Sequence, residues 1–473
     1  MNRVVVLLWV LVAATSLAQH QEPGWSARTA VIDEQRVEND SLCNVLQNMG
    51  TFEGHIRTFF MGTTNRQSFP DYYALAVGGG LGYYSPIIKN FQAGMSGFII
   101  YNLASTHLGP QPPFNNRYEV GLFEVRDPNN HDDLDRLEDL YLRYYFSQES
   151  NSFLQVGKFH LKTPMINLQD GRMRPNLQEG VWSEWNVARH WSVKAGWIWR
   201  TSPRGSIRWY QIGESLGVYP MGRAVNGNPA AYSGVMEIPG IAVGSFGYKS
   251  EAWNVQLWNY HVTGLMNTLL PKVEWTLKRS HHRWLVGAQV VDQRSLSNIA
   301  VPLEQQYTTR GEKARAISVR VSQEQTQTSR QWSLNYTRIT AEGRFLFPRE
   351  WGVEPFYTFM YRERTEGAGD VHAGVIQHRQ YLDQPHRLSM EAGVGVFLMP
   401  DVTNAALNKY AMPDYYQLNL RTRYKFKGFL HGLQGDLLYT FKRNLENELE
   451  PSPGYFHNKV DMHHLSLVMD YYF

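Results

Sequence analysis

Apolar and polar residues alternate with a period of two over long stretches of this chain, and this pattern restricts the fold most. Between Tyr415 and Phe426, the apolar or aromatic positions Tyr416, Leu418, Leu420, Tyr424 and Phe426 alternate with Gln417, Asn419, Arg421, Arg423 and Lys425. Comparable alternation recurs at 140–146, 191–199, 273–277, 317–322, 388–398, 433–441 and 464–473. Successive side chains of a β-strand point to opposite faces. The chain is therefore expected to be all-β.

A soluble β-sandwich would also alternate, so the choice between a sandwich and a barrel depends on further features. The apolar faces approach the roughly 9–11 residues that a tilted transmembrane strand needs, and Trp, Tyr or Phe stand at their ends. The chain contains 27 Tyr, a residue that favours the interface between membrane and water. We predict a transmembrane antiparallel β-barrel of about 18 strands, with 16 as the alternative, at roughly 25 residues per strand and connection.

The first residues predict export. Arg3 precedes an apolar run from Val4 to Val12, and Ser16-Leu17-Ala18 offers small residues at the positions that a signal peptidase reads. The run is too short to span a bilayer of roughly 30 Å as a helix. We predict a signal peptide over 1–18, a periplasmic N-terminal extension over 19–50 and a transmembrane barrel over 51–473.

The last residues point to the outer membrane. Met469, Tyr471 and Phe473 share the apolar face of the final stretch. This ending resembles the C-terminal insertion signal of outer-membrane barrels, which the barrel-insertion machinery reads. The chain is expected to be a multi-pass protein of the cell outer membrane, in contact with outer-membrane lipid and lipopolysaccharide.

Composition excludes several classes of protein. The net charge is +3, from 46 basic and 43 acidic residues, which is too balanced to indicate nucleic-acid binding. A single Cys allows no internal disulfide. The mean hydropathy of −0.41 and the lack of a later long apolar run exclude helical membrane spans. Neither H-E-x-x-H nor C-x-x-C occurs, so no metal or cofactor is predicted.

Polar stretches of unequal length separate the predicted strands. Short ones are expected to be periplasmic turns, and long ones extracellular loops. The candidate long loops are 105–135, 161–182, 200–241, 292–313, 362–386 and 399–413.

Basic residues on the polar faces are candidates for lining a pore. Arg421, Arg423 and Lys425 would form one column, joined by Arg143, Lys194, Arg320 and also Arg338. Such residues guide anions by their local field, and acids opposite them, at Asp436 and Glu391, would set up a transverse field. The alternative interpretation is that a water-filled lumen needs polar walls and that these charges are simply solvated.

One local motif resembles a known family. Gly157-Lys-Phe-His-Leu-Lys-Thr-Pro164, followed by Asp170-Gly-Arg-Met-Arg-Pro175 and Gly180, is similar to a segment of the porin D (OprD-like) family of substrate-specific outer-membrane channels. The resemblance implies an 18-strand barrel whose third outside loop, near 161–182, folds inward as a constriction loop carrying Asp170, Arg172, Arg174 and Pro175. It also implies passive uptake of small water-soluble solutes bearing a carboxylate, guided by arginines. Alternatively, Asp170 and Arg172 pair only to hold the shape of the loop.

The predicted function is therefore an outer-membrane porin without cofactor or catalytic activity, and homo-oligomers are compatible with it. The alternative is a barrel enzyme of the lipase, deacylase or protease type, with a Ser-His-acid or paired-acid site near the outer rim, for which His190, His261 and His464 are candidates. The motif Gly213-Glu-Ser-Leu-Gly217 matches a nucleophile elbow, but no helical pattern follows it. An energy-coupled receptor is disfavoured, because too few residues precede the first strand to form a plug.

Overall fold

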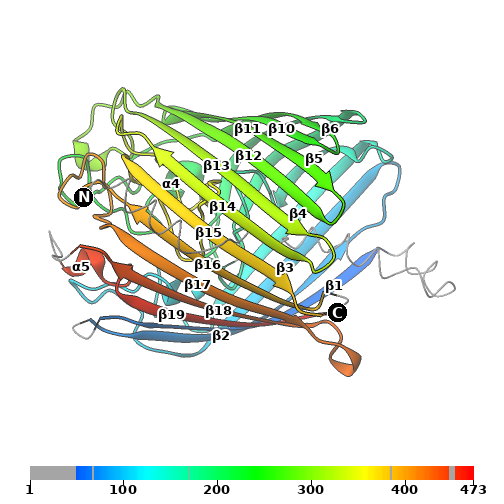
Figure 1. Cartoon of the computed structure of the whole chain (residues 1–473), viewed down its shortest axis with the longest axis horizontal. Helices are drawn as coiled ribbons and strands as arrows, with labels where there is room; N and C mark the ends of the chain where they lie inside the picture. Colours follow the sequence, from blue (N-terminus) through cyan, green and yellow to red (C-terminus); the bar gives the residue numbers. More distant parts are fainter. Residues whose placement is uncertain (1–49, 67–68, 170, 384–385, 447–452) are drawn as a thin grey trace.

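One antiparallel sheet closes on itself in the computed structural model of the chain (Figure 1). The structure describes residues 50–66, 69–169, 171–383, 386–446 and 453–473. The predicted signal peptide lies outside these residues, as does the N-terminal extension except for Gly50. Closure occurs where β1 (Thr51–Thr64) pairs with both β2 (Tyr72–Tyr84) and β19 (Met462–Tyr472).

Every strand of the ring pairs antiparallel with its neighbours. The other strands are β3 (Phe91–Ser105), β4 (Leu134–Ser147), β5 (Ser152–Phe159), β6 (Leu177–Ala188), β7 (Trp191–Ser202), β8 (Tyr210–Gln211), β9 (Ile241–Lys249), β10 (Trp253–Val262), β11 (Met266–Arg279), β12 (His282–Ser295), β13 (Lys313–Gln325), β14 (Arg330–Ile339), β15 (Val371–Tyr381), β16 (Leu388–Leu398), β17 (Tyr415–Lys425) and β18 (Leu433–Asn444). The two-residue β8 pairs with β7 alone, and β7 continues the ring with β9. The barrel therefore has 18 strands, which confirms the predicted fold class.

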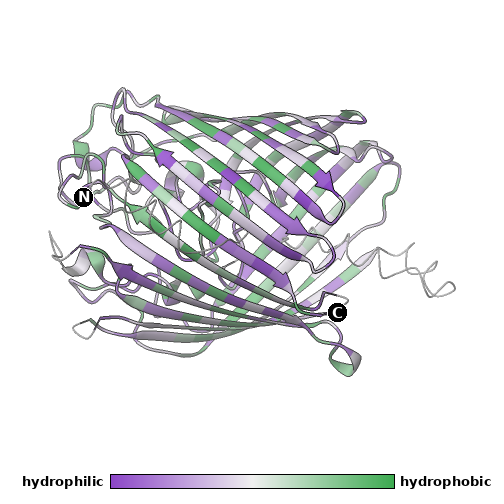
Figure 2. Ribbon diagram, in the orientation of Figure 1, coloured by the Kyte–Doolittle hydropathy of each residue, from purple (hydrophilic) through white to green (hydrophobic). Residues whose placement is uncertain are grey.

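The alternation of the sequence becomes the inner and outer faces of this barrel. In β17, Gln417 and Asn419 are buried inside the ring, whereas Leu420 points outward and is exposed. Figure 2 shows the same change of hydropathy from residue to residue along neighbouring strands. Outward aromatic residues gather where the strands meet the short turns: Phe91, Tyr144, Phe146, Trp191, Trp253, Trp275 and Trp284. Such girdles mark the interfaces of a membrane-spanning barrel.

The connections differ at the two ends of the barrel (Figure 1). At one end, here called the turn end, they are the short segments 85–90, 148–151, 189–190, 250–252, 280–281, 326–329, 382–387 and 426–432. At the other, here called the loop end, they include 106–133, 160–176, 203–240, 296–312, 340–370, 399–414 and 445–461. The helices α4 (Ile212–Ser215) and α5 (Pro453–Phe456) lie in these loops. Among the described residues, no helix has the length and hydropathy that a membrane crossing requires.

Two predicted loop ranges were wrong in part. The range 362–386 contains the strand β15, and the long loop comes before it at 340–370. In β15 the inward positions Ala373 and Val375 are apolar, and the outward positions include His372 and Gly374. This strand therefore lacks the pattern of polar residues inside and apolar residues outside. The range 161–182 ends in β6, which already begins at Leu177.

The loops fold into the ring and form a packed core there. The largest cluster of buried apolar side chains combines Trp351 and Phe345 from loop 340–370, Met165 from loop 160–176, and the inward-facing Tyr260 of β10. Each of these side chains is fully buried. Where the loops pack against the inner wall, the wall therefore carries inward-facing aromatic residues in place of the polar residues that a water-filled lumen requires.

The C-terminal residue completes the closure of the barrel. Gly54 of β1 donates its backbone N–H to the Phe473 carbonyl at 2.8 Å, and Phe473 donates to the Gly54 carbonyl at 3.1 Å. The Phe473 ring covers Gly54 so closely that a Cβ there would lie 2.3 Å from the ring. A side chain at position 54 would therefore displace the Phe473 ring from its present place.

We predict that Gly54→Ala lowers the free energy of unfolding by about 1 kcal/mol, because the added methyl group forces the ring off the strand. Urea unfolding in detergent, followed by tryptophan fluorescence, measures the change. Gly79→Ala is the matched control, since a Cβ on Gly79 meets only ordinary contacts of 3.7 Å or more. Equal stability of the two variants would contradict the prediction.

Candidate functional site: arginines on the loops inside the barrel

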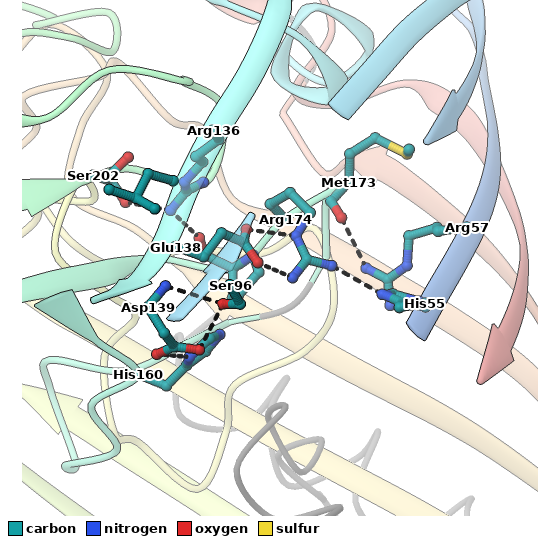
Figure 3. A network of polar contacts seen from close by, with 12 residues as sticks. His55, Arg57, Ser96, Arg136, Glu138, Asp139, His160, Met173, Arg174 and Ser202 are labelled. Carbon is teal, nitrogen blue, oxygen red and sulfur yellow. Dashed lines mark hydrogen bonds and ion pairs between the residues drawn. The ribbon is translucent and has the colours of Figure 1, made fainter. Parts of the chain in front are cut away.

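Loop 160–176 is fixed to the barrel wall by a buried ion pair (Figure 3). Arg174 binds Glu138 of β4 with two N–H groups, and the Nε to Oε1 distance is 2.6 Å. The same guanidinium contacts His55 Nδ1 of β1 at 3.0 Å and lies over the Phe98 ring of β3. His55 and Asp470 of β19 continue the network at 2.7 Å. One loop residue therefore contacts a continuous sector of the wall.

Wall arginines hold the backbone of the same loop. Arg57 Nη1 donates to the carbonyls of Arg172 and Met173 at 3.0 and 3.3 Å, and Arg136 Nη2 donates to the Pro175 carbonyl at 2.8 Å. Figure 3 shows Arg57 and Arg136 on either side of Arg174. These three hydrogen bonds from charged groups to neighbouring backbone carbonyls hold the loop backbone against the wall.

The loop reaches to the other side of the ring. Met165 N–H donates to the hydroxyl of Tyr260 in β10, and Asn167 N–H donates to the carbonyl of Trp351 at 3.3 Å. In the order of strands, β10 lies about halfway round the ring from β1. The anchored loop thus extends through the interior of the barrel.

Arginines from three loops converge on the tip of this segment, and we call Arg172, Arg204, Arg362 and Arg364 the arginine cluster. Arg172 Nη1 and Arg362 Nη1 both donate to the Gly171 carbonyl, at 2.7 and 3.2 Å. A Cβ on Gly171 would lie 3.9 Å from Arg204 Nη1. Arg364 Nη2 donates to Gln169 at 2.6 Å. The predicted Asp170 lies outside the described residues.

Glu354 pairs with Arg364 of the cluster at 3.4 Å, whereas Arg172, Arg204 and Arg362 form no ion pair with an acidic side chain among the described residues. Burial and the charge of Arg362 lower the pKa of Arg172 to about 9, and burial and Arg204 lower the pKa of Arg362 to about 10. Both side chains stay protonated at neutral pH. Burial raises the pKa of Glu119, the carboxyl group beside Thr63 and Asn116, and this favours its neutral form. A bound anion would relieve the repulsion among the guanidinium groups.

Arg204 gives the cluster a donor without a partner. Its Nε is buried and has no hydrogen-bond partner among the described residues. An unsatisfied buried donor of a charged group is costly. A carboxylate arriving at the cluster would supply the missing acceptor.

The six predicted pore-lining residues occupy inward positions, but most of them have partners within the wall. Arg143 donates to Gln155 at 2.7 Å, Arg320 to Asn335 at 2.8 Å, Lys194 to Glu184 at 2.6 Å, Arg421 to Asp436 at 2.8 Å and Arg423 to Glu391 at 2.6 Å. Lys425 is exposed where β17 ends.

Three details of that prediction were wrong. Arg143, Lys194 and Arg320 lie on β4, β7 and β13, none of which neighbours β17, so they do not extend its column. Asp436 and Glu391 lie on the strands next to β17, opposite Arg423 and Arg421 in the sheet, and form ion pairs with Arg421 and Arg423 instead of facing them across the lumen. Arg338 faces outward, because the inward residues of β14 are the odd-numbered positions such as Asn335 and Thr337. Its guanidinium pairs with Asp370.

The two described arginines of the motif in loop 160–176 have different partners. Arg172 belongs to the arginine cluster, whereas Arg174 contacts the wall. Arg204, Arg362 and Arg364 were missed, since they lie in irregular loops where periodicity gives no orientation. The segments Pro203-Arg204 and Arg362-Glu363-Arg364 were visible only as basic residues within long loops.

His464, a candidate residue of the enzyme alternative, is held in a network of hydrogen bonds. His464 Nε2 lies 3.0 Å from Ser466 Oγ, and its Nδ1 lies 3.7 Å from Glu119 Oε1. However, Arg362 donates to that same Nε2 at 3.0 Å and to Ser466 at 2.8 Å. A general base needs a free lone pair to take the hydroxyl proton, and here a guanidinium N–H occupies it.

The other candidates for catalysis lie apart from one another. His190 bonds the Lys249 carbonyl at the turn end, and His261 is exposed on the outer face. Ser215 of the G-x-S-x-G motif is fully buried and accepts a hydrogen bond from Trp351 Nε1 at 2.9 Å. Within the described part of the chain, no three His, Cys, Asp or Glu side chains are grouped to hold a metal ion.

A buried carboxyl group makes the packing of loop 340–370 depend on pH. Burial and the neighbouring Glu354 raise the pKa of Glu363 to about 8, despite the ammonium group of Lys442. The Tyr415 hydroxyl donates to Glu363 Oε1 at 3.0 Å. The folded chain therefore keeps this proton in a pH range where the unfolded chain releases it.

We predict that the stabilising contribution of this proton is complete below about pH 4.5 and is lost as the pH rises through about 8. Urea unfolding measured from pH 5 to 9 tests this. Glu363→Gln should flatten the pH dependence, whereas Glu342→Gln, at a more exposed loop carboxylate, should leave it unchanged. If the wild type and Glu363→Gln vary with pH in the same way, the assignment is wrong.

Comparisons with known proteins agree with this architecture. No protein-family model matches the sequence, and no curated protein matches it by sequence. Solved structures do match. OpdO of Pseudomonas aeruginosa is 14% identical with a TM-score of 0.65, and the match covers 90% of this chain and 97% of OpdO.

Two further structures have the same fold. OccAB2 of Acinetobacter baumannii is 12% identical with a TM-score of 0.70, over 90% of this chain and 99% of OccAB2. OpdK of Pseudomonas aeruginosa, solved with vanillate, is 12% identical with a TM-score of 0.66, over 89% of this chain and 98% of OpdK. The chain therefore has the fold of the OprD-like barrels, at low sequence identity.

Proposed function

We propose that the chain is an outer-membrane channel for passive diffusion of small water-soluble solutes that carry a carboxylate. The observation that carries this proposal is the arginine cluster, in which three loops bring Arg172, Arg204, Arg362 and Arg364 together inside a barrel of 18 strands. The loop end would face the cell exterior and the turn end the periplasm, as in other outer-membrane barrels.

The chemistry of the cluster suits a carboxylate. Guanidinium groups bind carboxylates through paired N–H donors, and their charge concentrates anions at a narrow site. Several arginines within reach of one another let a solute exchange partners without a deep energy minimum, which conduction requires. No chemical step and no energy source enters this process.

Further support comes from the wall and from one related fold. The inward basic residues near the turn end, such as Arg143, Arg320 and Lys425, would continue the path for an anion beyond the cluster. OpdK, which has the same fold, was solved with vanillate, an aromatic carboxylate. Both observations favour organic acids over neutral sugars.

The other assignments belong to the same proposal. Asp170, Arg172, Arg174 and Pro175 would form the constriction segment, in which Arg174 positions the loop and Arg172 meets the solute. Met469, Tyr471 and Phe473 would serve as the signal for the barrel-insertion machinery. Met469 and Tyr471 lie on the outer face of β19, and Phe473 follows directly after this strand. Residues 1–18 would be removed on export.

Transport by proteoliposomes tests this function. Gluconate and glucose have nearly the same size and differ in the carboxylate, so their uptake rates compare charge at constant geometry. We expect gluconate to enter several-fold faster than glucose. Glucose entering at the same rate or faster would overturn the carboxylate assignment, and failure of both solutes to enter would overturn the channel itself.

A further inference from the structure

The outer face of β12, β13 and β14 changes from apolar to charged as these strands approach the loop end. On β13 the outward residues Val321, Val319 and Ile317 are followed on the same face by Arg315 and Lys313. On β12 the outward Val290 is followed by Asp292 and Arg294. The change marks the height at which hydrocarbon gives way to lipid headgroups.

The pairing register places these charges side by side. Arg315 stands directly across from Asp292, and Lys313 across from Arg294. Arg338 of β14 stands across from Ile317, one pair below Arg315 on the outer face. Three adjacent strands, about 4.8 Å apart, thus contribute Arg294, Lys313, Arg315 and Arg338 to one surface, which we call the outer-rim patch.

Acidic neighbours hold the arginines of the patch in place without using all of their donors. Asp292 accepts from Arg294 Nε at 3.0 Å and from Arg315 Nε at 3.2 Å. Glu342 accepts from Arg315 Nη1 at 3.0 Å. Arg338 pairs with Asp370 at 2.6 Å. An arginine has five N–H donors, so these bonds orient Arg294 and Arg315 and leave further donors for a ligand.

The exposure of the patch matches its place on the membrane-facing surface. The side chains of Arg294 and Arg315 are 61% and 51% exposed. Outward residues below them, such as Ile317, are exposed as well and apolar. A partner of this surface must therefore combine acyl chains with negatively charged groups at the height of the arginines.

We propose that the outer-rim patch binds the phosphate groups of lipid A, the glycolipid that forms the outer leaflet. The acyl chains would lie along Val290, Ile317 and Val319, and the phosphates would accept hydrogen bonds from Arg294, Lys313 and Arg315. The site depends on placement of the loop end at the outer leaflet, but it does not depend on what passes through the lumen.

Binding to the full chain in detergent tests the proposal. The bound lipid is counted by native mass spectrometry in EDTA, with diphosphoryl lipid A, with the same lipid A after removal of both phosphates, and with phosphatidylglycerol. The test variant carries Arg294→Gln, Lys313→Gln and Arg315→Gln. The control carries Lys278→Gln, Arg283→Gln and Arg330→Gln, which neutralise basic residues at the turn end of the same sector.

We expect diphosphoryl lipid A to bind about tenfold or more weakly to the test variant, as for the loss of two or three charge-assisted hydrogen bonds. The control and the wild type should bind alike, and dephosphorylated lipid A should bind weakly to all three. Equal binding by the test variant and the control would overturn the site. Equally tight binding of dephosphorylated lipid A or phosphatidylglycerol by the wild type would overturn the assignment to lipid A phosphates.

Discussion

Replacing Arg204 and Arg362 together by glutamine is expected to lower the anion-to-cation permeability ratio of the channel by about tenfold or more. Both guanidinium groups lie beside Gly171, in a buried site where charges are poorly screened. At an effective dielectric constant of about 20 and a separation of roughly 6–8 Å, each charge contributes on the order of 2 kcal/mol to the energy of a passing ion. The reversal potential across a planar bilayer measures the ratio.

A second pair of inward arginines serves as the control. Arg143 and Arg320 face the lumen and bond neutral amides, so Arg143→Gln/Arg320→Gln also removes two charges. This variant should change the ratio less, because its residues lie nearer the turn end and apart from each other. A larger change in the control than in Arg204→Gln/Arg362→Gln would move the selective site from the loops to the wall.

Arg174→Met is expected to lower the free energy of unfolding by about 3–5 kcal/mol, the cost of leaving a buried charge without its partner. Arg174 and Glu138 are 3% and 1% exposed, so the carboxylate of Glu138 would stay buried after the guanidinium is lost. The measurement is urea unfolding in detergent, followed by tryptophan fluorescence.

The double variant Arg174→Met/Glu138→Met shows whether the stability lost in Arg174→Met comes from the unpaired charge of Glu138. Because an apolar pair of similar volume can replace a buried ion pair at little cost, most of the lost stability should return. Lys278→Met, which breaks a pair with the exposed Glu251, should leave the unfolding curve unchanged. If Arg174→Met behaves like Lys278→Met, the ion pair does not anchor the loop.

The barrel could be predicted from the sequence because the alternation of apolar and polar residues within each transmembrane strand shows which side chains point outward and which point inward. In β17 the alternation of Leu418 and Leu420 with Asn419 and Arg421 reproduces the outer and inner faces. The strand β15 escaped prediction, since packed loops cover its inward Ala373 and Val375 and make both faces apolar in part.

The residues of the candidate site could be predicted only where they belong to a short sequence motif. Arg172 and Arg174 were found because they share one short segment. Arg204 and Arg362 lie far from it in sequence, in loops whose course is fixed by tertiary contacts such as that of Arg362 with His464. The partners of the wall arginines were missed for a related reason: alternation gives the face of a residue, but not its neighbour across the sheet.

Single-channel recording of the wild-type protein in a planar bilayer, with asymmetric salt, tests whether the barrel is an anion-selective channel. We predict discrete, stable current steps whose reversal potential shifts toward the equilibrium potential of the anion. A shift toward the equilibrium potential of the cation, or the absence of steps from protein with an intact β-spectrum in circular dichroism, would contradict it.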